Sequence, residues 1–261
     1  RSRGLGDVYK RQVEYGKENK YDDDIFFQKY SQMSRSQQGL AGAGEWETLR
    51  KLLPDFKDKR VLDLGCGYGW HCIYAMEHGA SSVVGVDISH KMLEVAKEKT
   101  HFPQVEYKCC AIEDVEFPEE SFDVILSSLA FHYVADYEIL VKKIYRILKS
   151  GGKLVFTVEH PVFTAYGTQD WYYNEKGEIL HFPVDNYYYE GKRTAVFLGE
   201  KVTKFHRTLT TYLNTLLSNG FIINHIVEPQ PPEYMMDIPG MQDEMRRPMM
   251  LIVSANKKVD R

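Results

Sequence analysis

The sequence predicts an α/β fold built on a doubly wound, mostly parallel seven-stranded sheet, with a β-rich insertion after the fifth strand. From Ala43 onward, segments with strand character alternate with segments whose apolar residues have helical spacing. This alternation is typical of a parallel sheet covered by helices. In addition, the runs VLDL, VVGV, FDVIL and KLVFTV are nearly unbroken apolar stretches, as expected for strands that are covered on both faces.

The expected elements follow in a regular order. The strands of the main sheet are predicted at 61–64, 82–86, 105–108, 122–127, 153–159, 221–227 and 249–256. Helices are predicted around Trp46, Leu49, Leu52 and Leu53, then at 70–78 and 208–219. A further helix before the fifth strand has one apolar stripe for docking on a sheet, formed by Tyr137, Leu140, Val141, Ile144 and Leu148.

The rhythm changes after Pro161, where short alternating strands and turns indicate an insertion over residues 162–206. Its aromatic residues include Trp171, Tyr172, Tyr173, Tyr187, Tyr188 and Tyr189. Aromatic faces suit a lid over an apolar or cationic small acceptor, and the alternative is the core of a small hairpin. Residues 43–261 are predicted to form one domain behind an N-terminal arm, 1–42, and residues 1–12 are interpreted as a non-native leader or a frayed arm.

Composition excludes several classes of protein. Of the 261 residues, 33 are Lys or Arg and 37 are Asp or Glu, so the net charge of −4 offers no basic field for a nucleic-acid partner. The sequence has no apolar run near the ~20 residues that cross a bilayer, and no signal peptide is recognisable, so a cytoplasmic protein without a membrane partner is expected. The four cysteines have no CxxC spacing, so they are interpreted as reduced structural thiols, and no metal site is predicted.

The most informative stretch is RVLDLGCGYGWHC at 60–72, in which a buried strand carrying Asp63 runs into a series of glycines. Glycines let the backbone turn tightly and approach a ligand at the N-terminus of the next helix. A dinucleotide fingerprint has the spacing GxGxxG, whereas Trp70 stands where its third glycine would be. Asp87 closes the next strand about 20 residues later, where a carboxylate can accept both ribose hydroxyls. Together these features indicate an adenosine-type ligand.

In these motifs the sequence resembles the class I S-adenosylmethionine-dependent methyltransferases, and in particular the small-molecule subgroup of the methyltransferase type 11 group. The resemblance extends from about residue 55 to 159 and includes LDLGCGYG, GVDIS, SFDVILSSLAFHYV and ILKSGGKLVFTVEHP. It implies a Rossmann-like methyltransferase fold with S-adenosylmethionine as cofactor. It also implies that Gly65, Cys66 and Gly67 meet the methionine part, and that Asp63 reaches its ammonium directly or through water.

The resemblance further implies that Asp87 holds the ribose and that Ile88 lies against the adenine. The family commonly has an acidic residue before an apolar one in the next loop, but this chain has Ala111 and Ile112 there. Two readings stay open: either Glu113 supplies the carboxylate, or only the backbone at Ile112 contacts the base.

Three more residues are carried over from the resemblance. Ser127 is expected near the sulfonium, and Tyr30 and Arg35 are expected in a cap over the cofactor, the alternative for these two being an exposed arm. For Asp63 and Asp87, the structural alternative is that each caps the helix that follows it.

Candidate acceptor-side groups lie where parallel strands end, because ligands of open α/β sheets bind at the carboxyl ends of the strands. His132 and Tyr133 follow the fourth strand, and Glu159 and His160 lie at the end of the fifth. His206, after the insertion, is expected to fold back over the same opening. His132, His160 and His206 are the candidate catalytic bases.

The function expected from the resemblance is transfer of a methyl group from S-adenosylmethionine to a small-molecule acceptor by a monomer or homodimer. The atom methylated, whether O, N, S or C, stays open. Two alternatives are an S-adenosylmethionine-binding protein without transfer activity and, opposed by the glycine spacing, an NAD-dependent dehydrogenase.

Overall fold

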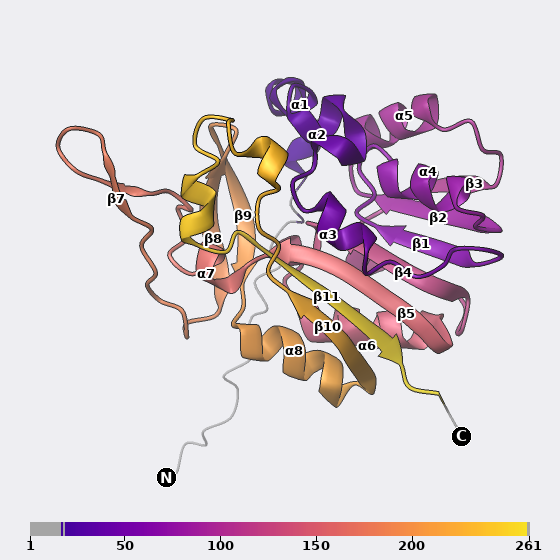
Figure 1. Cartoon of the computed structure of the whole chain (residues 1–261). Coiled ribbons are helices and arrows are strands. Elements are labelled where there is room, and N and C mark those ends of the chain that lie inside the picture. The colour runs from indigo at the N-terminus through magenta and orange to yellow at the C-terminus, as the bar shows by residue number, and fades with distance from the viewer. Residues whose placement is uncertain (1–16, 18, 260–261) are drawn as a thin grey trace, which may run out of the picture.

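The computed structural model describes residue 17 and residues 19–259, so the expected leader at 1–12 lies outside the described residues. Within this part of the chain the main sheet has seven strands in the order β10-β11-β5-β4-β1-β2-β3 (Figure 1). These strands are β1 Arg60–Leu64, β2 Ser82–Asp87, β3 Val105–Cys109, β4 Phe122–Ser128, β5 Leu148–Glu159, β10 Phe221–Val227 and β11 Met250–Lys257. The predicted sheet is confirmed.

Five strands of this sheet are parallel, and β11 pairs antiparallel with both β5 and β10. β1 lies between β2 and β4, so the chain builds outward on one side of β1 and then crosses to the other side. Ligands of open α/β sheets bind beside the carboxyl ends of the strands at such a switch point.

Helices cover both faces of the sheet (Figure 1). They are α3 Trp46–Arg50, α4 Trp70–Glu77, α5 His90–Lys99, α6 Tyr137–Ile147 and α8 Leu209–Ser218. Short 3-10 turns are η3 Ile112–Asp114, η4 Phe131–Tyr133, η5 Glu233–Met235 and η6 Asp243–Arg246. No helix in the described part of the chain is long and apolar enough to cross a membrane.

Successive side chains along each strand point to opposite faces of the sheet, which divides the core into two clusters. Leu62 of β1 packs with Leu140 and Ile144 of α6 on one face, whereas Val61 packs with Trp46 and Cys72 on the other. Four residues of the predicted apolar stripe lie on α6, whereas Leu148, which was expected on the same helix, is the first residue of β5. All five are buried in the core.

The first predicted helix is shorter than its apolar pattern indicates. α3 ends at Arg50, so Leu52 and Leu53 lie beyond it, although both pack against the core. Pro54 explains the early end, because a residue before proline is disfavoured in the helical conformation.

The segment before Ala43 packs on the body of the protein. Its elements are η1 Lys20–Asp22, α1 Asp24–Ser31, α2 Ser34–Gln37 and η2 Gly39–Gly42. Asp23 caps α1 by accepting a hydrogen bond from Phe26 N at 3.0 Å, and the Phe26 side chain is fully buried.

The β-rich insertion consists of the short helix α7 Pro161–Thr164 and two hairpins. The first pairs β6 Tyr172–Tyr173 with β7 Ile179–His181, and the second pairs β8 Gly191–Phe197 with β9 Glu200–His206. Figure 1 shows the β7 hairpin projecting from the body, whereas β8 and β9 stand beside the end of the main sheet.

Candidate active site

A glycine-rich turn connects β1 to α4. Gly65, Gly67 and Gly69 have φ angles of 78°, 53° and 76°, in the left-handed region that other residues rarely adopt. A Cβ atom on Gly65 would lie 2.4 Å from the Cβ of Ala130. Glycine is therefore needed at Gly65 for both its conformation and its lack of a side chain.

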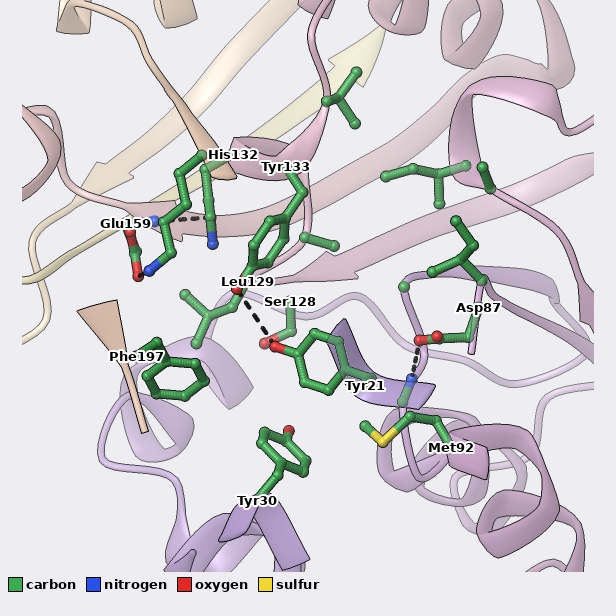
Figure 2. Close-up of a pocket in the computed structure, with 18 of the residues that line it drawn as sticks. Tyr21, Tyr30, Asp87, Met92, Ser128, Leu129, His132, Tyr133, Glu159 and Phe197 are labelled. Carbon is green, nitrogen blue, oxygen red and sulfur yellow. Dashed lines mark hydrogen bonds and ion pairs between the residues drawn. The ribbon is translucent and has the colours of Figure 1, made fainter. Parts of the chain in front are cut away.

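Asp87 ends β2 directly beside this turn. Its carboxylate accepts a hydrogen bond from Gly67 N at 2.8 Å (Figure 2) and another from Ser89 N at 2.9 Å. Burial raises the pKa of Asp87 despite these two hydrogen bonds. Ser89, not Asp87, caps α5, because its hydroxyl accepts from Met92 N at 3.1 Å. A carboxylate offers about four lone-pair positions, so Asp87 keeps acceptor capacity for a ligand.

A cavity of about 220 Å³ opens at the carboxyl ends of the parallel strands. The predicted site residues that line it are Tyr30, Arg35, Gly65, Gly67, Asp87, Ile88, Ala111, Ile112, Glu113 and His132. Figure 2 shows Asp87 and Glu159 at opposite ends, with Tyr21 and Tyr133 between them. Their hydroxyls lie 3.4 Å apart. The structure thus brings most of the sequence-predicted residues to one cavity.

The end of the cavity away from Asp87 contains a buried ion pair. Lys204 Nζ lies 2.5 Å from Glu159 Oε1 and donates to Gln169 Oε1 at 2.9 Å. Gln169 Nε2 in turn donates to Glu159 Oε2 at 2.5 Å. Burial alone would raise the pKa of Glu159, but the neighbouring His132 and Lys204 and the hydrogen bonds from Lys204 and Gln169 lower it below its usual range. Glu159 is therefore held as a carboxylate.

His132 stands next to this pair on η4 and is 2% exposed. Its Nδ1 accepts the backbone N–H of Glu159 at 3.4 Å, so the ring proton of the neutral form resides on Nε2. Burial lowers the pKa of His132 to about 4, which keeps the ring neutral at pH 7. The ring consequently presents a hydrogen-bond donor, not a base, at Nε2.

Leu129 follows β4 at the middle of the cavity and adopts a φ of 55°. This conformation is uncommon for a branched side chain. Thr157 supports it, since its carbonyl and its hydroxyl both accept from Leu129 N, at 2.9 Å and 3.0 Å. Such strain tends to occur at functional sites.

The N-terminal segment and the β8–β9 hairpin form a joint roof over the cavity. Asp22 accepts from Ser89 Oγ at 2.6 Å, which attaches η1 to the start of α5. Lys29 donates to Leu198 O at 3.0 Å, and Phe26 is buried against the hairpin. The roof residues that line the cavity are Tyr21, Tyr30, Met33, Arg35, Phe197 and Lys204.

Arg35 forms part of this roof through an ion pair. Its guanidinium donates to both carboxylate oxygens of Glu45, at 2.7 Å and 2.9 Å, and Glu45 is 3% exposed. The exposed-arm alternative for Tyr30 and Arg35 is therefore wrong, because both residues pack inward and line the cavity.

Three predicted cofactor residues do not line the main cavity. The Asp63 carboxylate is buried behind the glycine turn, where Cys72 Sγ contacts Oδ2 at 3.5 Å and Oδ1 has no hydrogen-bond partner. It does not cap α4, whose N-cap is Gly69. Cys66 lines an adjoining smaller pocket. Ser127 faces the other side of β4 and donates to Leu64 O at 2.7 Å, whereas its neighbour Ser128 lines the cavity.

Two of the predicted histidines are engaged elsewhere. His160 Nδ1 accepts from Val162 N at 3.0 Å, and its Nε2 lies 2.9 Å from the carboxylate of Glu228. His206 is fully buried, with Nδ1 2.7 Å from Thr164 Oγ1 and Nε2 2.8 Å from Tyr187 O. Neither histidine lines the cavity, because the ring nitrogens of His206 bond to Thr164 and Tyr187 within the insertion, and those of His160 face Val162 and Glu228.

The six aromatic residues of the insertion that were expected over the acceptor also do not line the cavity. Trp171 packs edge-on against Phe182 and lies under the guanidinium of Arg247, 5.0 Å from its ring centre. Tyr188 is 87% exposed and Tyr189 is 76% exposed. From this insertion the cavity receives Phe197 and Lys204 instead, because the second hairpin, not the first, stands beside the main sheet.

Comparison with known proteins identifies this arrangement. The family model described as a methyltransferase domain matches residues 62–156. A solved structure of a Listeria monocytogenes protein assigned to the S-adenosylmethionine-dependent methyltransferases is 58% identical, with a TM-score of 0.81, over 84% of this chain and 99% of that one. The chain belongs to the S-adenosylmethionine-dependent methyltransferases.

Two further relatives of this methyltransferase cover most of its length. The solved structure of an S-adenosylmethionine-dependent methyltransferase from Mesorhizobium loti is 41% identical, with a TM-score of 0.77, over 84% of this chain and all of that one. An uncharacterised protein from Haemophilus influenzae is 34% identical over 250 residues, which are 91% of this chain and 96% of that protein. The NAD-dependent dehydrogenase alternative is wrong, since the cofactor of this family is S-adenosylmethionine.

The residues of the methyltransferase fit this cofactor. Asp87 retains carboxylate lone pairs for hydroxyl groups, and Gly65 and Gly67 leave the space beside it free of side chains. The unpartnered Oδ1 of Asp63 provides a buried acceptor behind the turn. Bound S-adenosylmethionine supplies an electrophilic methyl group on a sulfonium.

Sequence reasoning missed several residues of this methyltransferase site, among them Lys204 and Tyr21. Lys204 alternates with Val202 and His206 along β9, all three of which are buried, so its place on an inward-facing row was a signal. Tyr21 offered none, because it reaches the cavity only through packing of η1 against other elements.

Proposed function

We propose that this methyltransferase transfers the methyl group of S-adenosylmethionine to a small-molecule acceptor bound in the same cavity. The observation that carries the proposal is the continuous cavity from Asp87 to the Glu159–Lys204 ion pair, beneath the joint roof. A site roofed in this way suits a small acceptor better than a chain of protein or nucleic acid.

In this proposal the Asp87 end holds the cofactor. Asp87 accepts the ribose hydroxyls, Ile88 and Ile112 pack on the adenine, and Glu113 contacts its amino group. Glu113 is placed for this role because it lines the cavity and its main chain is held by a hydrogen bond from Lys143 Nζ to its carbonyl at 2.7 Å.

The remaining protein groups align the acceptor and exclude water. Methyl transfer from a sulfonium is an in-line displacement, and positioning alone can contribute ~7–11 kcal/mol in favourable intramolecular cases. Tyr21, Tyr133 and Leu129 lie between the two ends of the cavity and would set the approach of the acceptor. The roof formed by residues 19–42 and the β8–β9 hairpin would act as cofactor cap and substrate lid.

Calorimetry and a turnover assay test this function. We expect S-adenosylmethionine and S-adenosylhomocysteine to bind, and NAD to fail to bind. Incubation with a cell extract separated into metabolite and macromolecule fractions should then yield S-adenosylhomocysteine with the metabolite fraction. Labelled methyl groups appearing only in macromolecules would contradict the small-molecule acceptor. Binding without turnover in either fraction would favour a cofactor-binding protein without transfer activity.

A further inference from the structure

We propose that the acceptor carries an anionic oxygen, an ionised hydroxyl or a carboxylate, and that Lys204 and His132 bind this oxygen. The inference rests on the proposed function, because it concerns the end of the cavity that the cofactor leaves to the acceptor.

The first support is the hydrogen-bonding capacity that remains at this end. Lys204 has three N–H donors, of which Glu159 and Gln169 accept one each. The third donor belongs to a residue that lines the cavity. Both oxygens of Glu159 already accept a hydrogen bond, so the capacity left over is mainly that of a donor.

His132 adds a second donor beside Lys204. Its Nδ1 accepts from the Glu159 backbone, which leaves Nε2 with the proton. Figure 2 shows the ring beside Glu159, with a nitrogen directed toward the interior of the cavity. An oxygen with several lone pairs can accept from His132 and Lys204 together, whereas an ammonium group has no lone pair to offer either of them.

The local charge also favours an anion. Lys204 and Glu159 cancel one another, but Arg207 is a second buried cation, 5% exposed, and its charge acts on His132. Its guanidinium donates to the backbone carbonyls of Phe205, Val134 and Ala135 and also hydrogen-bonds with Tyr212. The charged groups that act on His132 are thus these two cations and the single carboxylate of Glu159, so the charge at this donor is net positive and weakly screened.

Two aromatic rings and an aliphatic side chain lie around these donors. Lys204 Nζ lies 5.4 Å from the ring centre of Phe197 and 6.0 Å from that of Tyr133, and Leu129 completes the lining. Walls of this kind suit a planar aromatic or conjugated molecule. The anionic oxygen would then be the one strongly hydrated group of the acceptor, and the two donors would replace the hydrogen bonds that it makes to water.

The test uses three matched probes on protein saturated with S-adenosylhomocysteine: 4-nitrophenol, benzoate and benzylamine. We expect one or both anions to bind at least about tenfold more tightly than benzylamine, as a charge-assisted hydrogen bond provides. If 4-nitrophenol binds as its anion, its absorbance will show its pKa lowered by about 1–3 units, as an adjacent cation causes. Tighter binding of benzoate would identify a carboxylate as the source instead of an ionised hydroxyl.

Variants assign the effect to Lys204. Lys204→Met should remove the preference for anions, and Lys201→Met is the matched control, because Lys201 is exposed on the same strand. Lys204→Met leaves Glu159 buried without its partner, so the double variant Lys204→Met/Glu159→Gln removes both charges together and should show the same loss. His132→Phe should weaken anion binding without reversing the preference.

The outcomes separate this inference from the proposed function. If the wild type does not bind S-adenosylhomocysteine, the proposed function itself fails. If S-adenosylhomocysteine binds but benzylamine binds as tightly as the anions, or none of the probes binds, the anionic acceptor is wrong. An anion preference that survives in both Lys204 variants would also overturn the assignment to Lys204.

Discussion

The backbone N–H of Gly67 donates a hydrogen bond to the carboxylate of Asp87 over 2.8 Å. This contact joins the turn after β1 to the end of β2, which are neighbours in the sheet but 20 residues apart in the chain. The carboxylate is therefore oriented by the protein before any ligand arrives. Asp87 cannot rotate away without losing the bonds from Gly67 and Ser89, so its orientation costs little on binding.

Asp87→Ala should weaken S-adenosylmethionine binding at least about tenfold, because a charge-assisted hydrogen bond contributes ~1.5–3 kcal/mol. Calorimetry measures this loss, and circular dichroism checks that the variant folds. Asp237→Ala is the control, since Asp237 is exposed and does not line the cavity. Equal affinity of the Asp87 variant and the wild type would remove Asp87 from the cofactor site.

Glu113→Gln tests how the adenine is read. If the Glu113 carboxylate accepts from the exocyclic amine, the wild type should prefer S-adenosylhomocysteine over its inosyl analogue, and the variant should lose much of that preference. Competition calorimetry with the two ligands gives the ratio. An unchanged ratio would mean that the backbone at Ile112 alone contacts the base.

The stability of the free protein should depend on Asp63. Burial raises the pKa of Asp63 to about 7, above the ~3.9 of an unfolded aspartate. The contribution of the protonated Asp63 side chain to folding stability is thus complete below pH ~4 and is lost as the pH rises through 7. Asp63→Asn should therefore be more stable than the wild type at pH 8, by on the order of 2–4 kcal/mol, and should gain much less at pH 5. Urea unfolding at the two pH values measures the difference.

The same carboxyl group gives a test of its cofactor contact. If the ammonium of S-adenosylmethionine reaches Asp63, binding at pH 6 should release a proton, which calorimetry in buffers of different ionisation enthalpy detects. Asp63→Asn should abolish this release. Binding without proton release in the wild type would show that the ammonium lies elsewhere.

Asp22→Ala should loosen the roof. The Asp22 carboxylate accepts from Ser89 Oγ at 2.6 Å and Lys91 N at 3.2 Å at the start of α5, and loss of such a cap costs about 0.5–2 kcal/mol. We expect faster limited proteolysis within residues 19–42 and weaker cofactor retention. Asp237→Ala, which changes an exposed residue outside the roof, should cleave at nearly the wild-type rate; equal cleavage of all three proteins would argue against the attachment.

Phe197→Ala should reduce turnover more than S-adenosylhomocysteine affinity. The reason is that Phe197 lines the cavity away from Asp87, although it also packs against Phe26 of the roof, with ring centres 5.7 Å apart, so that a smaller loss of affinity is expected. Turnover with the metabolite fraction should fall at least tenfold, since mispositioned reactants lose rate steeply. Tyr188→Ala alters another aromatic residue of the insertion that is 87% exposed, and its turnover should match the wild type. A loss of activity in Tyr188→Ala alone would instead place the lid in the segment between the two hairpins.

Much of this site could be predicted because its residues are neighbours in short motifs. Gly65, Gly67 and Asp87 lie at the ends of adjacent apolar strands, and strand order alone brings such ends together. Ser127 and Ser128 show the limit of such a prediction. Successive side chains of a strand point to opposite faces, so a difference of one residue decides which side chain enters the cavity. His206 shows a second limit, because its position in the sequence after an insertion does not determine which partners its buried ring contacts.

By itself, the sequence determined the doubly wound sheet, its glycine turn and the carboxylate beside it, since periodicity and spacing act over a few residues. Only the tertiary structure decided that Tyr21 and Lys204 meet His132 and Glu159 in one cavity. Those residues come from the N-terminal segment, the second hairpin and the ends of two strands, and no local pattern encodes the packing that joins them. The physical reason is that the roof is held over the ends of the strands by contacts between segments distant in the sequence, such as Phe26 against the β8–β9 hairpin. The geometry of these contacts is determined only when the whole chain has folded.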